Sequence, residues 1–306
     1  MGSAVLTALH ELGGTLVAPV RTFVHRFPKD VKQPIISGID ADTDWTEVLS
    51  GIDVVVHCAA RVHIMSESCL NPLSEFRKVN LDGTLALARQ AAEMGVRRFV
   101  FVSTIKVNGE LSREGVAFRH DDRPNPEDDY GLSKAEAEAA LKELSSKTGM
   151  EVVVIRPPLV YGPGVKGNFA RLISLAGSGI PLPFGAMKNA RSFVALENLI
   201  DLIVLCIKHP KAAGEVFLVS DGESISTPSL IRKIAAAMGK RCWLIPFPEQ
   251  IFRIGFILFG KQAVMDRLFG SLEVDITHTK DTLGWSPSVT LEQGLSRTVR
   301  KPGVDC

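Results

Sequence analysis

Arg-Phe-Val-Phe-Val-Ser, at residues 98–103, is a short run that is largely apolar on both faces and ends in a hydroxyl. Such a strand is typical of a parallel sheet that is covered on both sides. Similar runs alternate with longer helical patterns, at Ser74–Met94 and Tyr130–Thr148. The other strand candidates are Thr15–Val20, Ile35–Ile39, Asp53–Cys58, Val152–Arg156 and Glu215–Val219. This alternation predicts an α/β fold with a doubly wound parallel sheet.

The chain changes character after Gly162. Proline and glycine become frequent between residues 163 and 185, and the helical patterns there are interrupted by short extended pieces. We therefore expect residues 163–306 to form a smaller C-terminal substrate-binding lobe. This lobe is expected to be interleaved with residues 1–162 and not to be an independent domain.

Charge and composition argue against several classes of partner. The chain has 35 basic and 34 acidic residues, so there is no reason to expect nucleic acid or an anionic membrane as the main partner. Its five cysteines contain no C-x-x-C pair and are too scattered for a zinc site, so we expect no metal.

No run reaches the ~18 apolar residues of a membrane span, and the nearest candidate, Ile251–Phe259, is interrupted by Arg253 and Gly255. With no signal-peptide pattern at its start, we expect a cytoplasmic protein with free thiols.

The sharpest chemical signal is Tyr130-Gly131-Leu132-Ser133-Lys134. Four residues on a helix are about one turn, so the phenol and the ammonium lie on one face. A nearby ammonium favours the phenolate and lowers the pKa of a tyrosine towards the range of a general acid/base. A surface Tyr–Lys pair is the alternative interpretation.

A second signal is the pair of hydroxyls that ends the strand at residues 98–103. Ser103 and Thr104 follow this strand, and ligands of open α/β sheets bind at the carboxyl ends of strands. Either hydroxyl is placed to hydrogen-bond the same substrate oxygen as Tyr130. The alternative is an ordinary hydroxyl that caps a turn.

Together with three further motifs, these signals resemble the extended short-chain dehydrogenases/reductases, the NAD-dependent epimerase/dehydratase family, which modify nucleotide sugars. Thr104 stands 26 residues before Tyr130, and the resemblance runs from Gly2 to about Thr298. The further motifs are His57-Cys58-Ala59-Ala60, Asn80 within V-N-L-D-G-T, Arg156–Gly164 (R-P-P-L-V-Y-G-P-G) and Leu283-Gly284-Trp285-Ser286-Pro287.

The resemblance implies a Rossmann-like, NAD(P)-binding domain over residues 1–162 and a role for each matching residue. Tyr130 would be the acid/base and Thr104 its hydroxyl partner, while Lys134 would tune Tyr130 and bind the nicotinamide ribose. The remaining cofactor contacts would be Gly2, Arg21, Asp40 at the adenine, Ala59, Ala60, Asn80, Ser103 and Pro157. The substrate contacts would be Lys106 at the sugar, and Asn168 and Arg191 at the nucleotide diphosphate. Taken alone, Arg191 is better explained as a solvated surface arginine, and Lys106 is equally well explained as a solvated loop residue.

Two departures from the family pattern bear on activity. The family opens with a strand and a G-x-x-G-x-x-G turn that holds the pyrophosphate. Here Gly2 matches the last glycine, so we expect a sheet that lacks its first strand and binds dinucleotide weakly. Arg21 stands where an acidic residue would favour NAD, which favours NADP(H) over NAD as cofactor.

The longer strings at residues 57–65 and 103–110 resemble a bacterial surface-polysaccharide subgroup of UDP-sugar C4 reductases and UDP-glucose 4-epimerase-like proteins. The leading hypothesis is NADPH-dependent reduction of a UDP-4-keto-6-deoxy-N-acetylhexosamine. The alternative is a UDP-glucose or UDP-N-acetylglucosamine 4-epimerase with bound NAD. Residues 156–159 argue against this alternative, because they lack the asparagine expected of galactose-type epimerases. A second alternative is an inactive, truncated protein. Relatives also imply a homodimer through Ser74–Met94 and Tyr130–Thr148.

Overall fold

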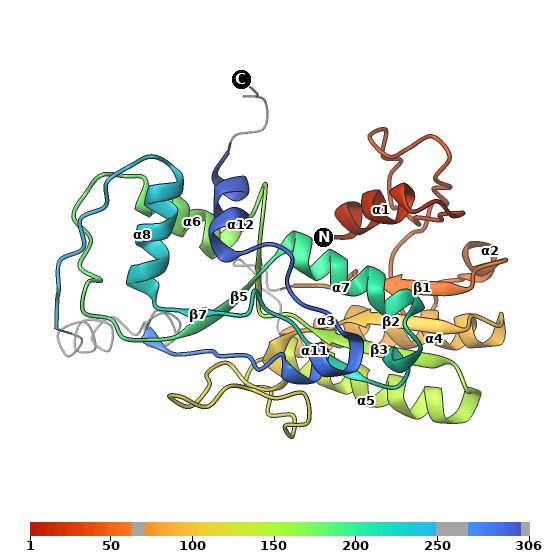
Figure 1. Cartoon of the computed structure of the whole chain (residues 1–306). Helices are drawn as coiled ribbons and strands as arrows, with labels where there is room; N and C mark the ends of the chain where they lie inside the picture. The colour runs from red at the N-terminus through yellow and green to blue at the C-terminus, as the bar shows by residue number, and fades with distance from the viewer. Residues whose placement is uncertain (63–70, 249–268, 301–306) are drawn as a thin grey trace.

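A computed structural model describes residues 1–62, 71–248 and 269–300, and its centre is a four-stranded parallel sheet (Figure 1). The strand order is β1-β2-β3-β6, and every neighbouring pair is parallel. The register places Val54 opposite Arg98 and Arg98 opposite Glu151. The strands are β1 (Val54–His57), β2 (Arg98–Val102), β3 (Glu151–Arg156) and β6 (Val216–Leu218). The predicted parallel sheet is therefore confirmed.

Helices cover both faces of this sheet. One apolar cluster joins the sheet to α1 (Gly2–Glu11), α7 (Leu196–Lys208) and α11 (Thr277–Leu283). A second cluster joins the other face to α2 (Thr46–Leu49), α4 (Thr84–Glu93) and α5 (Asp129–Thr148). Two helical faces around one sheet make a three-layer, doubly wound α/β fold, as predicted.

Local sequence sets the bounds of the helices around the sheet. The Asp128 carboxylate accepts a hydrogen bond of 2.7 Å from the amide of Gly131 and caps α5, which ends where Gly149 takes a φ of 76°. The helix expected at Ser74–Met94 runs instead as three consecutive pieces. They are α3 (Pro72–Arg77), the π-helical turn η1 (Lys78–Gly83) and α4.

Two predicted strands, Thr15–Val20 and Ile35–Ile39, are not formed. The first segment makes only isolated parallel bridges, from Val17 to Lys32 and from Val20 to Ile35. Pro34 stands between Lys32 and Ile36, whose amides donate to residues 16 and 20, and it has no N–H of its own to continue the ladder. In the described ranges, the edge of β1 that faces away from β2 pairs with no strand.

A smaller lobe lies beside the large sheet, at the left of Figure 1. It contains a three-stranded sheet of order β4-β5-β7, and a third apolar cluster fills it. Its elements are β4 (Leu159–Tyr161), α6 (Gly167–Ala176), β5 (Arg191–Ala195), β7 (Ser224–Ile225), α8 (Thr227–Ala237) and α12 (Leu291–Val299). The chain leaves this lobe to form α7, β6 and α11 on the large sheet, so the two parts alternate along the sequence. The predicted boundary at residue 162 remains a prediction.

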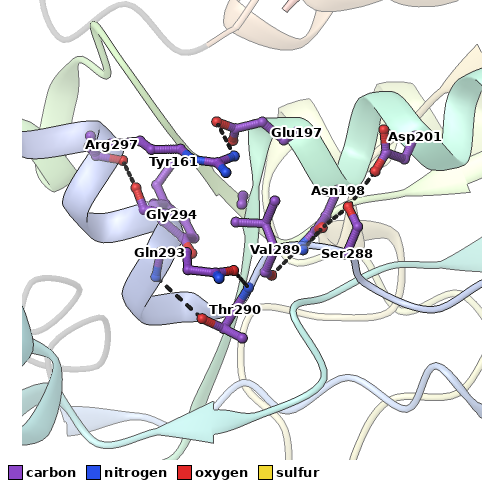
Figure 2. A network of polar contacts seen from close by, with 12 residues as sticks. Tyr161, Glu197, Asn198, Asp201, Ser288, Val289, Thr290, Gln293, Gly294 and Arg297 are labelled. Carbon is purple, nitrogen blue, oxygen red and sulfur yellow. Dashed lines mark hydrogen bonds and ion pairs between the residues drawn. The ribbon is translucent and has the colours of Figure 1, made fainter.

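A buried polar network ties the two parts together (Figure 2). The Tyr161 hydroxyl donates a hydrogen bond of 2.7 Å to Asp221, and the side-chain amide of Asn198 donates to the same carboxylate at 2.7 Å. The Asn198 side chain also pairs with the backbone of Val289. Gly294 of α12 packs on the Tyr161 ring, and a Cβ there would stand 2.6 Å from the Tyr161 hydroxyl oxygen. This contact therefore requires glycine.

Candidate active site

The carboxyl ends of β1, β2 and β3 bring most of the predicted site residues to one edge of the sheet. Ala59 and Ala60 follow β1, Ser103 and Thr104 follow β2, and Pro157 follows β3. The loops are tied together, because the amide of residue 105 donates to the Pro157 carbonyl at 3.0 Å. Parallel strands in register end side by side, so these residues line one edge.

Lys134 enters this edge from α5. Its side chain is buried, with a relative exposure of 1%, and Nζ donates a hydrogen bond of 2.8 Å to the carbonyl of Val102. The same ammonium lies 3.7 Å from the centre of the Phe101 ring, a favourable cation–π contact. Burial lowers the pKa of Lys134 to about 7, while the negative charge of Glu138 and the Cys58 thiol oppose that decrease. A lysine held in this way is poised between its charged and neutral forms.

Tyr130 lies in the first turn of α5, with its ring edge against Phe76 at 6.1 Å between centroids. Burial and, to a smaller extent, the negative charge of the Asp128 carboxylate raise its pKa to about 12. This result differs from the expectation that Lys134 lowers the pKa of Tyr130. The physical reason is that the phenol is buried beside a carboxylate, and both favour its neutral form.

Thr104 is buried directly after β2 and caps the short 3-10 helix η2 (Ile105–Val107) by accepting the amide of Lys106 at 3.3 Å. Thr104 therefore caps a turn, as the alternative interpretation predicted. It can still hydrogen-bond a substrate oxygen, because a hydroxyl that accepts one hydrogen bond has its own proton to donate.

Asn80, predicted to contact the cofactor, sits in the π-helical turn η1 and is buried. Its side-chain oxygen accepts from the amide of Arg61 at 2.8 Å. Its side-chain nitrogen donates to the Arg61 carbonyl and to the Ser133 hydroxyl, both at 3.0 Å. Asn80 thus fixes the loop after β1 to α5, and its contact with the cofactor stays a prediction.

Ser103, also predicted to contact the cofactor, points inward. Its hydroxyl donates to the carboxylate of Glu138, which also receives two donors from Arg156. Glu138 is a functional candidate that the sequence motifs did not single out, and Arg156 was named there only as the first residue of a motif, with no role assigned. The available signals were the spacing of four residues from Lys134 and the charged residue that ends the apolar strand β3.

Lys106 pairs with two acidic residues. Its ammonium donates to Glu110 at 2.7 Å and also binds the carboxylate of Asp128. Burial raises the pKa of Asp128, but the Lys106 hydrogen bond and the Gly131 amide outweigh burial, so the pKa is lowered. A contact between Lys106 and the sugar remains a prediction.

Arg191 and Asn168, predicted at the nucleotide diphosphate, lie in the smaller lobe. Arg191 begins β5 and donates to the carbonyl of Gly270 at 2.8 Å. Burial lowers its pKa, and Glu110 raises it. Asn168 is exposed in the first turn of α6. The shared role of Arg191 and Asn168 at the nucleotide diphosphate stays a prediction.

Gly2 lies where the N-terminus of α1 meets the edge of the sheet. Burial raises the pKa of the Cys58 thiol to about 11, and the amino group of Met1 opposes that rise. Cys58 follows β1, so this electrostatic interaction places the start of α1 near the carboxyl end of β1. The amides at a helix N-terminus favour anions such as a pyrophosphate.

Asp40 and Arg21 lie in the segment between α1 and α2, which contributes no strand to the large sheet. The Asp40 carboxylate accepts from the Thr43 hydroxyl at 2.9 Å and from the Asp42 amide at 3.2 Å, which closes a turn. Arg21 is exposed, one residue after the bridge at Val20. The adenine contact of Asp40 and the choice of cofactor by Arg21 remain predictions.

Comparison with known proteins identifies the family. Residues 1–220 match the model of the NAD dependent epimerase/dehydratase family. The chain belongs to this family. A protein of Vibrio cholerae described as UDP-glucose 4-epimerase is 52% identical over 266 residues, which cover 87% of this chain and 81% of that protein. A GDP-6-deoxy-D-mannose reductase of Pseudomonas aeruginosa is 26% identical over 304 residues, 95% of this chain and 89% of that protein.

Solved structures show the same fold. A UDP-N-acetylglucosamine 4-epimerase of Bacillus cereus superposes with a TM-score of 0.77 at 19% identity, over 96% of this chain and 93% of that one. A UDP-glucuronic acid 4-epimerase of Bacillus cereus, solved with NAD, has a TM-score of 0.75 at 22% identity, over 97% and 93%. The predicted Rossmann-like fold is confirmed.

The family description also confirms the predicted class of cofactor, a nicotinamide dinucleotide. The residues at the sheet edge fit such a group. Ala59 and Ala60, which follow β1 at this edge, carry only methyl side chains, and charged Lys134 donates one of its three N–H groups to Val102, which leaves two for ribose hydroxyls. The helix N-terminus at Gly2 suits the pyrophosphate.

Among residues 1–62, 71–248 and 269–300, no helix is long and apolar enough to cross a membrane, and no group of three or more His, Cys, Asp or Glu side chains is arranged to hold a metal ion. Ile251–Phe259 and residues 63–65 of the quoted string lie outside the described residues.

Proposed function

We propose that this chain is a UDP-hexose 4-epimerase that works with NAD, in the synthesis of surface polysaccharide in the cytoplasm. The observation that carries the proposal is the 52% identity to the Vibrio cholerae protein described as UDP-glucose 4-epimerase. Supporting it, Tyr130, Lys134 and Thr104 all lie at the carboxyl edge of the parallel sheet. The comparisons thus favour the epimerase over the reductase, which was the leading hypothesis from the motifs.

In this proposal, each residue has a defined task. When bound, the nicotinamide ring supplies a reversible acceptor for the hydrogen at C4 of the hexose. Tyr130 removes the proton of the C4 hydroxyl and later returns it to the same oxygen. Thr104 donates a hydrogen bond to that oxygen, and the charge of Lys134 stabilises the phenolate. The sugar would pass through a 4-keto form and turn its other face to the nicotinamide, so that the hydride would return to C4 on that face while Tyr130 returns the proton to the oxygen.

The phenol needs this help, because its pKa of about 12 keeps it neutral at pH 7. Placing the ammonium of Lys134 near the phenolate lowers the energy of the charged form. Since the hydride would return to C4 and the proton to the same oxygen, turnover would consume neither cofactor nor acid.

The test is conversion of UDP-glucose to UDP-galactose by the purified chain with added NAD, followed by chromatography of the nucleotide sugars. Tyr130→Phe keeps the ring and removes the hydroxyl, and we expect it to lose about 10²–10⁴-fold in rate. Absence of conversion at any NAD concentration would refute the proposal.

The reductase remains the second candidate, because Arg21 stands where an acid would favour NAD and Pro158-Leu159 replaces the expected aromatic–asparagine pair. A parallel reaction with NADPH and a UDP-4-keto-6-deoxy-N-acetylhexosamine tests it. Substrate-dependent loss of the NADPH absorbance, without conversion of UDP-glucose, would establish the reductase instead.

We also propose a homodimer through the segments Ser74–Met94 and Tyr130–Thr148, which lie on one face of the large sheet as α3, η1, α4 and α5. Light scattering of the purified chain tests the assembly. A mass of one chain at micromolar concentration would refute it.

A further inference from the structure

Glu138 is a buried carboxylate in the same helix as the proposed acid/base. It lies four residues after Lys134 on α5, so the two side chains share a helical face. Its side chain is 9% exposed, and its neighbours on the inner side of α5 are the apolar Ala137 and Leu141. A buried charge in an apolar helix face costs free energy unless it is fully paired.

The carboxylate is paired on both sides. Arg156, which ends β3, donates from Nε at 3.1 Å and from Nη2 at 2.6 Å, in a forked contact. Ser103, which follows β2, donates its hydroxyl to the same carboxylate. Glu138 therefore connects α5 to the ends of two neighbouring strands.

The network continues beyond the strands. Nη1 of Arg156 donates to the side chain of Asn108 at 3.0 Å, and Asn108 donates to the backbone carbonyl of Arg119 at 2.8 Å. Each member of the network is hydrogen-bonded, which is the condition under which a buried polar network rigidifies its surroundings.

The consequence for the site is geometric. Ser103 precedes Thr104 directly, so the bond that holds Ser103 also fixes where β2 delivers the Thr104 hydroxyl. On the other side of the bond, Glu138 holds α5, which carries Tyr130 and Lys134. Together with the hydrogen bond from Lys134 to the Val102 carbonyl, this carboxylate fixes the distance between the two halves of the proposed catalytic triad.

We propose that Glu138 is a positioning residue for the C4 reaction: it anchors α5 to the ends of β2 and β3 and holds a negative charge about one helical turn from Lys134. This inference rests on the function proposed above. It assigns no contact between Glu138 and the substrate or the cofactor.

The electrostatics agree with the geometry. Burial lowers the pKa of Lys134 to about 7, and Glu138 is the first of the groups that oppose this decrease. The other titratable groups that interact with the ammonium are Cys58 after β1 and His57 on β1; His57 is buried and has its own pKa lowered to about 3, so it is neutral at pH 7. Removing the carboxylate therefore leaves no full negative charge among the groups that oppose the decrease.

The first test is Glu138→Gln, which keeps the shape and removes the charge. NMR of the ¹³Cε-labelled lysines, without substrate, should show the pKa of Lys134 lower by about one unit, the low end of the range for an opposite charge within 4–6 Å. In the epimerase assay, kcat should fall about ten-fold at pH 8 with little change in KM, and the alkaline limb of the pH–rate profile should move to lower pH.

The matched control is Glu136→Gln on the same helix. Glu136 is partly exposed and pairs with Arg77 on α3. It does not appear among the groups that affect Lys134. We expect this variant to leave both the pKa of Lys134 and the pH–rate profile unchanged.

A second variant, Glu138→Asp, separates charge from anchoring. It keeps the carboxylate but shortens the reach to Arg156 and Ser103, so kcat should fall while the alkaline limb stays in place. It also covers the case in which Glu138→Gln does not fold, because the Asp variant then carries the test.

The outcomes distinguish this inference from the proposed function. One outcome is that the wild-type chain does not convert UDP-hexoses but the pKa of Lys134 is lower in Glu138→Gln. This outcome refutes the epimerase and supports the electrostatic effect of Glu138 on Lys134. Wild-type conversion, with kcat, pH profile and pKa of Lys134 unchanged in both Glu138 variants, refutes the inference and keeps the epimerase.

Discussion

Replacing Gly294 by alanine tests the contact that joins α12 to β4. The added Cβ would stand 2.6 Å from the hydroxyl oxygen of Tyr161 and 3.0 Å from Cε2 of its ring. The ring cannot retreat easily, because it is buried, stacks on Phe169 at 5.2 Å and hydrogen-bonds Asp221 at 2.7 Å. The change should therefore destabilise the smaller lobe.

The magnitude follows from three effects. Overpacking of a filled core costs about 1–3 kcal/mol. Displacing the Tyr161 hydroxyl from the Asp221 carboxylate removes a charged hydrogen bond worth about 1.5–3 kcal/mol. The better helix propensity of alanine returns about 1 kcal/mol. We expect Gly294→Ala to lower the free energy of unfolding by about 1.5–5 kcal/mol.

Urea unfolding followed by circular dichroism measures this change, with Gly2→Ala in α1 as the control. A Cβ at Gly2 meets no atom within 4 Å, so the control should be as stable as the wild-type chain or slightly more stable. In a double-mutant cycle with Tyr161→Phe, the loss caused by Gly294→Ala should be smaller, because the closest atom is gone. An unfolding midpoint of Gly294→Ala equal to that of the wild-type chain would refute the reasoning.

Two further changes test the large sheet and the helix beside it. His57 is buried and its pKa is lowered from 6.5 to about 3, so its neutral form is favoured by folding. The contribution of His57 to the free energy of unfolding should be constant above pH 6.5 and fall by about 1.4 kcal/mol per pH unit below it. In urea titrations at pH 7 and pH 5, His57→Gln should lose less stability between the two pH values than the wild-type chain. An equal loss in both proteins would contradict this prediction. Gly83→Ala would place a Cβ 2.7 Å from the Ile39 side chain and 2.9 Å from its backbone. We expect about 1–3 kcal/mol of lost stability, and an unchanged melting temperature would show that the segment at Ile39 yields freely.

The parts of the fold that depend on local pattern were predictable from the sequence. The apolar run at residues 98–103 and the Tyr130–Lys134 spacing led directly to β2, α5 and the edge where they meet. The two segments at Thr15–Val20 and Ile35–Ile39 have strand composition but do not form strands. Strand formation depends on a partner, and composition alone does not report one.

The electrostatics of the site were less predictable. The spacing of Tyr130 and Lys134 suggested a lowered tyrosine pKa, whereas burial and Asp128 raise it. Glu138 went unnoticed because a carboxylate four residues from a lysine on a helix is most often a solvated surface pair. Its role depends on Arg156, which only the fold brings to it.

The alternation of the two lobes along the chain has a consequence for synthesis. β6 completes the large sheet only when residue 218 has been made, and α11 covers it only at residue 283. Most of the smaller lobe has been synthesised when α11 is made, but its last helix, α12, follows α11 in the chain. Neither lobe can therefore complete its core before the other is nearly complete. The contacts between β3 and β6 join residues that are far apart in the sequence, so we expect this strand pairing to form slowly. The two lobes are therefore expected to mature together, late in translation, and to be inseparable by cutting the chain at any one point.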